Sequence, residues 1–319
     1  MNNSLNKIFF IAGKIILLTL FFFALTAQAS DEWPGKKTFV IGFAQDNMAN
    51  DWRMAQVMDV KKELEKYPFI TFFYTDGKGQ AAKQVLDIED MIQQKVDILI
   101  TSPMDAQAMT PVISSAFQKG IPVVLIGRTI TTQDYTCFIA PDNRQIARQA
   151  AIYMAQKMEG KGRILMLKGV DGATSTIYRT QGFLQQIKSY GGIEIAVVKT
   201  ANYLRNDAIM VMEEVLEKDQ KFDAIYAQSD SMATGARMAL KMAGKDPKKF
   251  LMVGIDYISE ARQAIRIGEQ SASFTYPTCG KQGAQAALKI LKEEKVPKQI
   301  RIESIMITKD NVEKINPIF

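Results

Sequence analysis

The feature that most constrains this chain is a regular alternation of short apolar runs with helix-patterned segments. The apolar runs are rich in Val, Ile and Phe, the composition of buried strands, and they cover residues 39–43, 69–74, 96–101 and 121–126. Segments with helical spacing of apolar residues separate these runs at residues 52–66, 81–94 and 106–119. Strands that alternate with helices across short turns predict a parallel sheet with helices on both faces.

The second half of the chain repeats this alternation. Further strands are expected at residues 163–168, 193–198, 222–227 and 250–255. Helices are expected between them at residues 176–190, 206–218 and 232–244. Segments 96–128 and 222–256 have the form of two copies of one unit, because each begins with an apolar residue and Asp and crosses a helix to a second strand. The sequence therefore predicts an α/β protein made of two doubly wound, parallel-sheet lobes.

Three segments are expected to join the lobes as a hinge. The first link is expected near residues 138–142, and the chain returns near 273–276 and again near Glu303. Two lobes of ordinary domain size suit this length better than one core does. The expected N-terminal and C-terminal lobes are residues 30–140 plus 277–302 and residues 141–276 plus 303–319.

The first 29 residues have the pattern of a cleaved signal peptide. Lys7 and Lys14 supply positive charge, residues 15–25 form an apolar core, and a small-residue cleavage site ends at Ala29. The apolar run is too short to span a bilayer. We therefore expect the mature chain to begin near Ser30 and to reside in the periplasm of a Gram-negative bacterium.

Composition excludes several classes of protein. The sequence has no His, which excludes Ser-His-Asp and Cys-His nucleophiles and imidazole metal sites. Its two cysteines, Cys137 and Cys279, are not spaced as zinc ligands, and their pairing in a disulfide is left open. The formal net charge of +6, or +4 without Lys7 and Lys14, is modest and spread along the chain, which argues against nucleic acid as a partner. No glycine-rich phosphate loop follows a strand, and neither a metal nor a cofactor is expected.

Polar and aromatic side chains gather just beyond the carboxyl ends of the predicted strands, where open α/β sheets bind ligands. These residues are Gln45, Asp46, Asp51, Trp52, Arg53, Asp76, Ser102, Arg128, Asp142, Asn143, Asn202, Tyr203, Ser229, Asp230, Asp256 and Tyr276. Flat rings, forked donors and carboxylate acceptors suit a small polar ligand with one apolar face, such as a sugar. The set favours binding over catalysis, although a hydrolase that pairs Asp230 with Asp256 is the enzymatic alternative.

Several stretches resemble the periplasmic sugar-binding proteins of ABC importers, in the group that binds ribose, galactose and galactofuranose. The matching stretches are residues 41–45 with 51–53, 96–103, 120–124 with Arg128, 139–143, 178–183, 222–230 and 253–256. Trp52 followed by Arg53 most resembles the galactofuranose-binding branch. The resemblance implies two lobes that close on a ligand, with a monomeric protein that needs no cofactor.

The same resemblance implies roles for individual residues. Trp52 would stack on the sugar, Arg128 and Arg179 would donate to its oxygens, and Asp256 would accept from its hydroxyls. Tyr203 would form the wall of the ligand site on the side of the second lobe. Ser229 or Asp230, together with Tyr276, would complete the site. We expect the ligand-binding set to comprise Arg179 and the strand-end residues above other than Asp46, Asp76, Asn143 and Asn202.

Structural alternatives exist for several of these residues. Trp52 could instead cap the core, and Arg179 could be an ordinary helix-surface arginine. Asp256 could also serve as a helix N-cap, and Tyr203 and Tyr276 could pack at the surface or in the hinge.

The chain departs from the family pattern at two positions. Gly127 stands where the family commonly has Asp before the arginine, and its lack of a carboxylate is expected to leave Arg128 without a neutralising partner. Ser229 stands where Asn is common. With three arginines converging, an anionic or carbonyl-rich ligand rivals a neutral sugar.

The expected function is capture of a small sugar, with a furanose or a sugar derivative left open, and its delivery to an ABC permease. The alternative is a sensory adaptor that presents a small, anionic or neutral ligand to a chemoreceptor or a histidine kinase. A DNA-binding repressor is disfavoured, because the signal peptide stands where a helix-turn-helix would.

Overall fold

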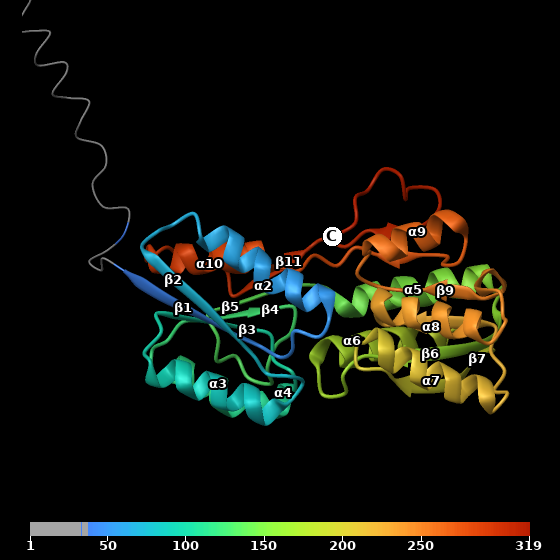
Figure 1. Ribbon diagram of the computed structural model, residues 1–319, viewed down its shortest axis with the longest axis horizontal. Helices are drawn as coiled ribbons and strands as arrows, with labels where there is room; N and C mark the ends of the chain where they lie inside the picture. Colours follow the sequence, from blue (N-terminus) through green and yellow to red (C-terminus); the bar gives the residue numbers. More distant parts are fainter. Residues whose placement is uncertain (1–32, 34–37) are drawn as a thin grey trace, which may run out of the picture.

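The computed structural model describes Trp33 and residues 38–319, and the predicted signal peptide lies outside these residues. The described chain forms two α/β bodies that lie side by side along the long axis of the molecule (Figure 1). No helix within these residues combines the length and apolar character needed to cross a bilayer. The same residues contain no cluster of acidic or sulfur side chains suited to hold a metal ion.

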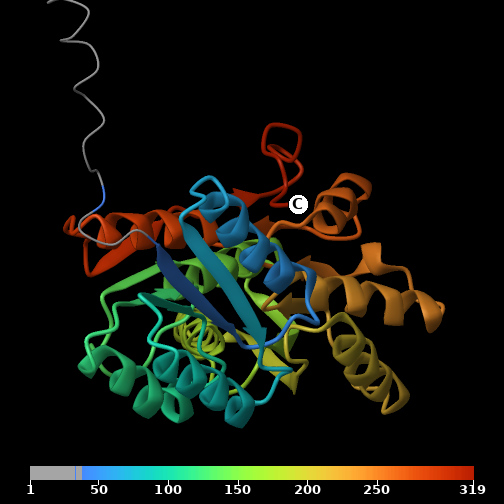
Figure 2. The same ribbon diagram turned by 60° about the vertical axis from the view of Figure 1, so that its left-hand side comes forward.

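The first body is built on a six-stranded sheet in the order β11-β5-β4-β3-β1-β2, all of it parallel. Its strands are β1 (Phe39–Gln45), β2 (Ile70–Asp76), β3 (Ile98–Thr101), β4 (Val123–Ile126), β5 (Cys137–Pro141) and β11 (Gln299–Ile302). One face is covered by α2 (Asp51–Leu64) and α10 (Gly280–Leu291), and the other by α3 (Ala81–Gln93) and α4 (Ala106–Gln118) (Figure 1). In Figure 2 β1 and β2 run side by side at the front of this body.

The second body contains a four-stranded parallel sheet in the order β7-β6-β8-β9. Its strands are β6 (Lys161–Lys168), β7 (Gly192–Thr200), β8 (Ala224–Ala227) and β9 (Leu251–Val253). Its helices are α5 (Asn143–Lys157), α6 (Thr174–Ile187), α7 (Arg205–Glu217), α8 (Asp230–Met242), the short η1 (Pro247–Lys249) and α9 (Ser259–Ile267). The helices α5 and α6 pack on one face of the sheet, and α7 and α8 pack on the other.

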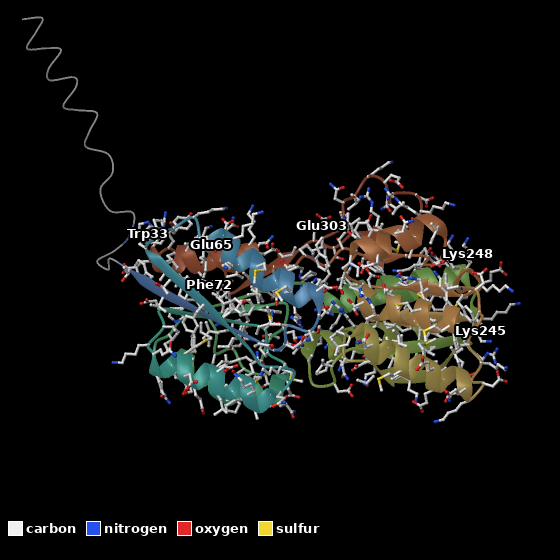
Figure 3. All side chains as sticks on the ribbon, in the orientation of Figure 1. Trp33, Glu65, Phe72, Lys245, Lys248 and Glu303 are labelled. Atoms are coloured by element: carbon white, nitrogen blue, oxygen red, sulfur yellow. The ribbon has the colours of Figure 1, made fainter. Side chains whose placement is uncertain are left out.

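The chain passes between the two bodies at three places. It leaves β5 for α5 near Asp142, returns between β10 (Ser273–Phe274) and α10, and leaves β11 for β12 (Met306–Ile307). The strands β10 and β12 form an antiparallel pair beside β9. Figure 3 places Glu303 at the junction of the bodies and Lys245 and Lys248 at the far end of the second body.

The core of the first body shows why the apolar runs become strands. Ile41 and Phe43 on β1 are fully buried between the helix layers, and so is Ile100 on β3. A buried side chain of this size stabilises the fold by about 1.5–3 kcal/mol relative to an exposed one. Because both faces of each central strand are covered, these strands are apolar throughout.

The predicted α/β fold with parallel sheets is confirmed, but β5, β11, α5, α9 and α10 were not predicted, and several predicted elements differ at their ends. The predicted strand at residues 250–255 is only Leu251–Val253, and the helix predicted from residue 232 begins at Asp230. The helix starts earlier because Ser229 caps it by accepting a hydrogen bond from the amide of Met232. Residues 138–142, expected as a link, lie mostly in β5, so the link itself begins at Asp142.

The two cysteines, whose pairing the sequence leaves open, are free thiols in the structure. Both are buried, Cys137 on β5 and Cys279 at the start of α10. Burial raises the pKa of Cys137 to about 11 and the pKa of Cys279 to about 12. Neither thiol is therefore a ready nucleophile at neutral pH.

Candidate ligand-binding site

A cavity of about 370 Å³ lies where the carboxyl ends of the two sheets face each other. This volume includes space that is open to solvent. Both bodies contribute to its lining, which consists of Asn50, Trp52, Arg53, Gly127, Arg128, Ser175, Arg179, Tyr203, Asp256 and Tyr276.

The first turn of α2 places Trp52 and Arg53 in the cavity wall. The side chain of Asn50 caps this helix by accepting hydrogen bonds from the amides of Trp52 and Arg53. The indole Nε1 of Trp52 donates to the carbonyl of Tyr276 at 3.0 Å, which fixes the plane of the ring. Trp52 is 6% exposed and packs against the core of the second body while it lines the cavity, so the core-capping and ligand-facing interpretations both describe it.

Asp46 lies between two arginines of the first body. Its Oδ2 accepts from Nη1 of Arg128 at 2.8 Å, and its Oδ1 lies 3.2 Å from Nε of Arg53. The expectation that Gly127 leaves Arg128 unneutralised is therefore wrong, because Asp46 reaches it from the loop after β1. Burial, and then the positive charge of Arg128, lower the pKa of Arg53 to about 10. Arg53 still carries its proton at neutral pH.

Arg179 projects into the cavity from α6 and is 3% exposed, which excludes the helix-surface interpretation. Its Nε donates to Oδ1 of Asn143 at 2.8 Å, and its Nη1 donates to the carbonyl of Gln228. The guanidinium carbon lies 4.5 Å from the centre of the Tyr276 ring, within cation–π range. These contacts hold the guanidinium plane in one orientation.

Tyr203 forms the wall of the second body. Its hydroxyl makes hydrogen bonds with the hydroxyls of Thr176 at 2.8 Å and Ser175 at 3.1 Å. A Cβ at Gly169 would lie 1.9 Å from the Tyr203 ring, so the ring lies directly on glycine backbone. This close approach requires glycine there.

Asp256 has an unusual backbone and an unusual charge environment. Its φ of 119° lies in a backbone region that residues with side chains rarely adopt. The N-cap residue of α9 is Ile258, so Asp256 is not a helix N-cap. Burial raises the pKa of Asp256 well above its ordinary value, against the opposing attraction of Arg179. A buried carboxylate that lines a cavity is suited to accept hydrogen bonds from ligand hydroxyls.

Tyr276 joins the hinge to both bodies. Its hydroxyl donates to the carbonyl of Gly127 at 3.2 Å and accepts from Nδ2 of Asn143 at 3.1 Å. It is 2% exposed, and burial raises its pKa to about 12. Tyr276 is therefore a neutral, fixed ring at the base of the cavity.

Comparison with known proteins decides the family, because residues 41–295 match the periplasmic binding protein domain. The chain belongs to the periplasmic binding protein family. The ribose import binding protein of Bacillus subtilis (strain 168) is 30% identical over 295 residues, which cover 89% of this chain and 95% of that relative.

Two solved structures are similar in fold and sequence to this binding protein. The fructose binding periplasmic domain of a hybrid two component system is 33% identical with a TM-score of 0.82, covering 86% of this chain and 92% of that chain. A galactofuranose binding protein is 27% identical with a TM-score of 0.81, covering 86% and 96%. Membership of a family of substrate-binding proteins confirms the expectation of a binding protein rather than an enzyme.

The structure brings seven of the predicted residues to the cavity wall of the binding protein and places six elsewhere. Those at the wall are Trp52, Arg53, Arg128, Arg179, Tyr203, Asp256 and Tyr276. Those that do not line it are Gln45, Asp51, Ser102, Asp142, Ser229 and Asp230.

Four of the six outlying residues support the wall or cap helices. The hydroxyl of Ser102 accepts a hydrogen bond from Nη1 of Arg53 at 3.0 Å. Nε2 of Gln45 donates a hydrogen bond to Oε1 of Gln56 at 3.0 Å. Asp142 and Ser229 are the N-caps of α5 and α8. The two remaining residues are Asp51, at the exposed rim, and Asp230, which is buried behind Asp256 and accepts from the Tyr257 amide.

Asn50 and Ser175 line the cavity but were not predicted. The N-cap preference for Asn directly before a helical stretch could have drawn attention to Asn50. Ser175 carries no comparable local signal, because its place depends on how α6 faces the first body.

The two bodies touch directly around the cavity. Nδ2 of Asn50 donates to the carbonyl of Tyr203 at 2.5 Å, and the amide of Thr129 donates to the hydroxyl of Thr174 at 3.0 Å. The amide of Ala106 donates to the carbonyl of Gly172 at 3.0 Å. These bonds hold the two bodies in direct contact at the rim of the cavity.

Proposed function

We propose that this binding protein captures a small sugar between its two lobes and delivers it to the permease of an ABC importer. The observation that carries the proposal is the cavity lining, in which rings, forked donors and a carboxylate from both bodies converge. A sugar presents an apolar ring face and a rim of hydroxyls, which match these groups. Relatives named for ribose import and for galactofuranose binding support a sugar, with a furanose as one form.

We assign the lobes as residues 30–140 plus 277–302 and residues 141–276 plus 303–319, with the three crossings as the hinge. The sheet memberships of β1 to β5 and β11 on one side, and β6 to β9 on the other, support this division. Ligand would stabilise the closed form because it touches groups of both lobes only there.

Within this proposal, individual side chains have separate tasks. Trp52 stacks on the ring face, Arg128 and Arg179 donate to ring and hydroxyl oxygens, and Asp256 accepts from hydroxyls. Their fixed orientations support these roles, since each is held by protein contacts such as the bond of Trp52 to Tyr276. A site ordered before binding loses less entropy when the ligand arrives.

Export to the periplasm through the segment 1–29 is part of the proposal, and the family supports the compartment. Sequencing the amino terminus of the protein recovered from the periplasm tests it. A chain that begins near Ser30 is the expected result, and retention of Met1 would contradict it.

The test of ligand class is a thermal-shift screen against pentoses, hexoses and their furanose forms. A ligand at 100 times its Kd stabilises the folded state by about 2.7 kcal/mol, which raises Tm by roughly 5–10 °C in a protein of this size. Arg179→Ala should reduce the shift for the same compound, because it should weaken binding by roughly 1–3 kcal/mol. A panel in which no sugar or sugar derivative shifts Tm would contradict the proposal.

A second candidate function is presentation of the ligand to a membrane sensor. It is favoured by the similarity to the fructose binding domain of a two component system. Deletion of the gene separates the two functions, because loss of labelled sugar uptake indicates import. Intact uptake with loss of the transcriptional response to the sugar indicates sensing.

A further inference from the structure

The cavity holds more guanidinium groups than carboxylates. Arg53, Arg128 and Arg179 line it and are 7%, 1% and 3% exposed. Among the described residues that line it, Asp256 alone carries a carboxylate. Asp46 lies behind the wall and is shared by Arg53 and Arg128. One positive charge therefore remains without a matching negative charge even when both carboxylates are ionised.

The carboxylate behind Asp256 does not change this balance. Asp230 accepts from Ser273 and from Nε2 of Gln270, and Gln270 accepts in turn from Arg237. Arg237 is itself 5% exposed and attracts Asp230. The two charges compensate each other within the second body and away from the cavity.

Arg128 has a donor that the protein does not use. Its Nε is buried, and no acceptor among the described residues reaches it. The Nη1 atom is taken by Asp46 and by the carbonyl of Pro103. A buried guanidinium with an unpaired N–H costs free energy unless a ligand supplies the acceptor.

Glycine at position 127 leaves room for a small group next to Arg128. A Cβ on Gly127 would lie 3.6 Å from Nε2 of Gln56 and 3.7 Å from Cη2 of Trp52, which are ordinary contact distances. The nearest polar groups there, Gln56 and Ser102, are both uncharged. A ligand group can occupy this space, and a negative group there would face the two arginines that share Asp46.

We propose that the preferred ligand is an acidic monosaccharide whose carboxylate lies beside Gly127 and is held by Arg53 and Arg128. The inference rests on the proposed sugar-binding function and makes it more specific. A carboxylate supplies the missing acceptor and the missing negative charge together, and guanidinium groups bind carboxylates through charge-assisted hydrogen bonds. The hydroxyl rim of the same ligand remains for Arg179 and Asp256.

The test compares matched pairs of compounds on the purified protein by isothermal titration calorimetry. The pairs are galactose and galacturonate, glucose and glucuronate, and ribose and ribonate, with ribose 5-phosphate as a larger anion. In at least one pair the acid should bind about tenfold more tightly than its neutral parent. Tight binding of a neutral sugar with no gain for its acid would overturn the inference and leave the proposed function standing.

The site of the carboxylate is tested by placing an acid at position 127. Gly127→Asp should weaken binding of the acidic sugar by about tenfold or more, because two negative charges would then compete for the same arginines. Gly127→Asn is the matched control, since it has the same size and the same φ of +72° without the charge. It should retain at least several-fold more affinity than the Asp variant.

Equal losses in the Asp and Asn variants would overturn the assigned position. Binding of ribose 5-phosphate but of none of the carboxylates would overturn the assigned ligand class. Failure of every sugar and every acid to bind would contradict the proposed function as well, so the two failures are distinguishable.

Discussion

Individual residues that line the cavity combine a proposed binding role with a cost to stability. Arg53, Arg128, Arg179 and Asp256 are all buried charges, and burial of charge is unfavourable unless partners compensate it. The partners here are Asp46, Asn143 and the carbonyl of Gln228. Substitutions at these residues should therefore separate affinity from stability.

Replacing Arg179 tests its proposed role as a donor to the ligand. Arg179→Ala should weaken ligand binding by roughly 1–3 kcal/mol, because ligand oxygens would be left buried without a donor. Arg144→Ala is the matched control, since Arg144 also lies over a tyrosine ring, at 4.4 Å from that of Tyr178, but is exposed outside the cavity. Calorimetric titration of both variants checks the expectation, and equal affinities would refute the role of Arg179.

Replacing Asp256 tests the cost of its buried charge. Burial raises the pKa of Asp256 in the folded state, so the folded protein binds a proton more readily than the unfolded chain does. Folding stability at this site is then greatest below the unfolded pKa of about 3.9 and falls as pH rises toward the folded pKa. Asp256→Asn should therefore unfold at a higher temperature than wild type at pH 7 and should bind ligand less tightly.

Melting curves between pH 4 and pH 8 check this expectation. The gain in Tm from Asp256→Asn should shrink as the pH is lowered, because protonation neutralises the wild-type side chain too. A variant that is less stable than wild type at pH 7 would show that attraction to Arg179 and Arg53 outweighs burial.

At the scale of elements, the first turn of α2 does two tasks with one side chain. Oδ1 of Asn50 caps the helix, while Nδ2 donates to the carbonyl of Tyr203 in the facing body. The helix start and the closed arrangement are thus linked through a single amide. Asp at this position would keep the cap and lose the donor.

Asn50→Asp should leave the unfolding temperature nearly unchanged and weaken ligand binding by about 0.5–2 kcal/mol. The loss has a physical cause, since a carboxylate facing the Tyr203 carbonyl disfavours closure. Asn50→Ala is the comparison, because it removes both the cap and the donor and should also lower stability by about 1 kcal/mol. An Asn50→Asp protein with wild-type affinity would exclude this bond as a contributor to closure.

At the scale of the whole molecule, the proposed closure of the lobes depends on a close fit at the rim. A Cβ at Gly172, in the loop before α6, would lie 1.8 Å from Oδ2 of Asp105 at the start of α4. The two residues belong to different bodies, so this contact exists only when the bodies are together. A side chain at Gly172 is therefore expected to lower the population of the closed form.

Gly172→Ala should shift the protein toward an open form, with a larger radius of gyration by small-angle scattering and a weaker Kd. Gly79→Ala is the matched control, because Gly79 also has a positive φ, of 70°, but would place its Cβ in open space. Both variants should lose about 1 kcal/mol of stability from the left-handed backbone. If the radius of gyration changes equally in both, the rim contact does not control closure.

Local patterns in the sequence determined the α/β class, the two halves and most of the cavity wall. Strand and helix periodicity is encoded by near neighbours, and the rule that parallel sheets bind ligands at strand ends located Trp52, Arg128 and Asp256. Tertiary structure alone decided the pairings across long separations. Asp46 reaches Arg128 and Asn50 reaches Tyr203 because the loops and bodies fold together. Such contacts depend on distances in three dimensions, and these distances cannot be read from the spacing of residues along the sequence.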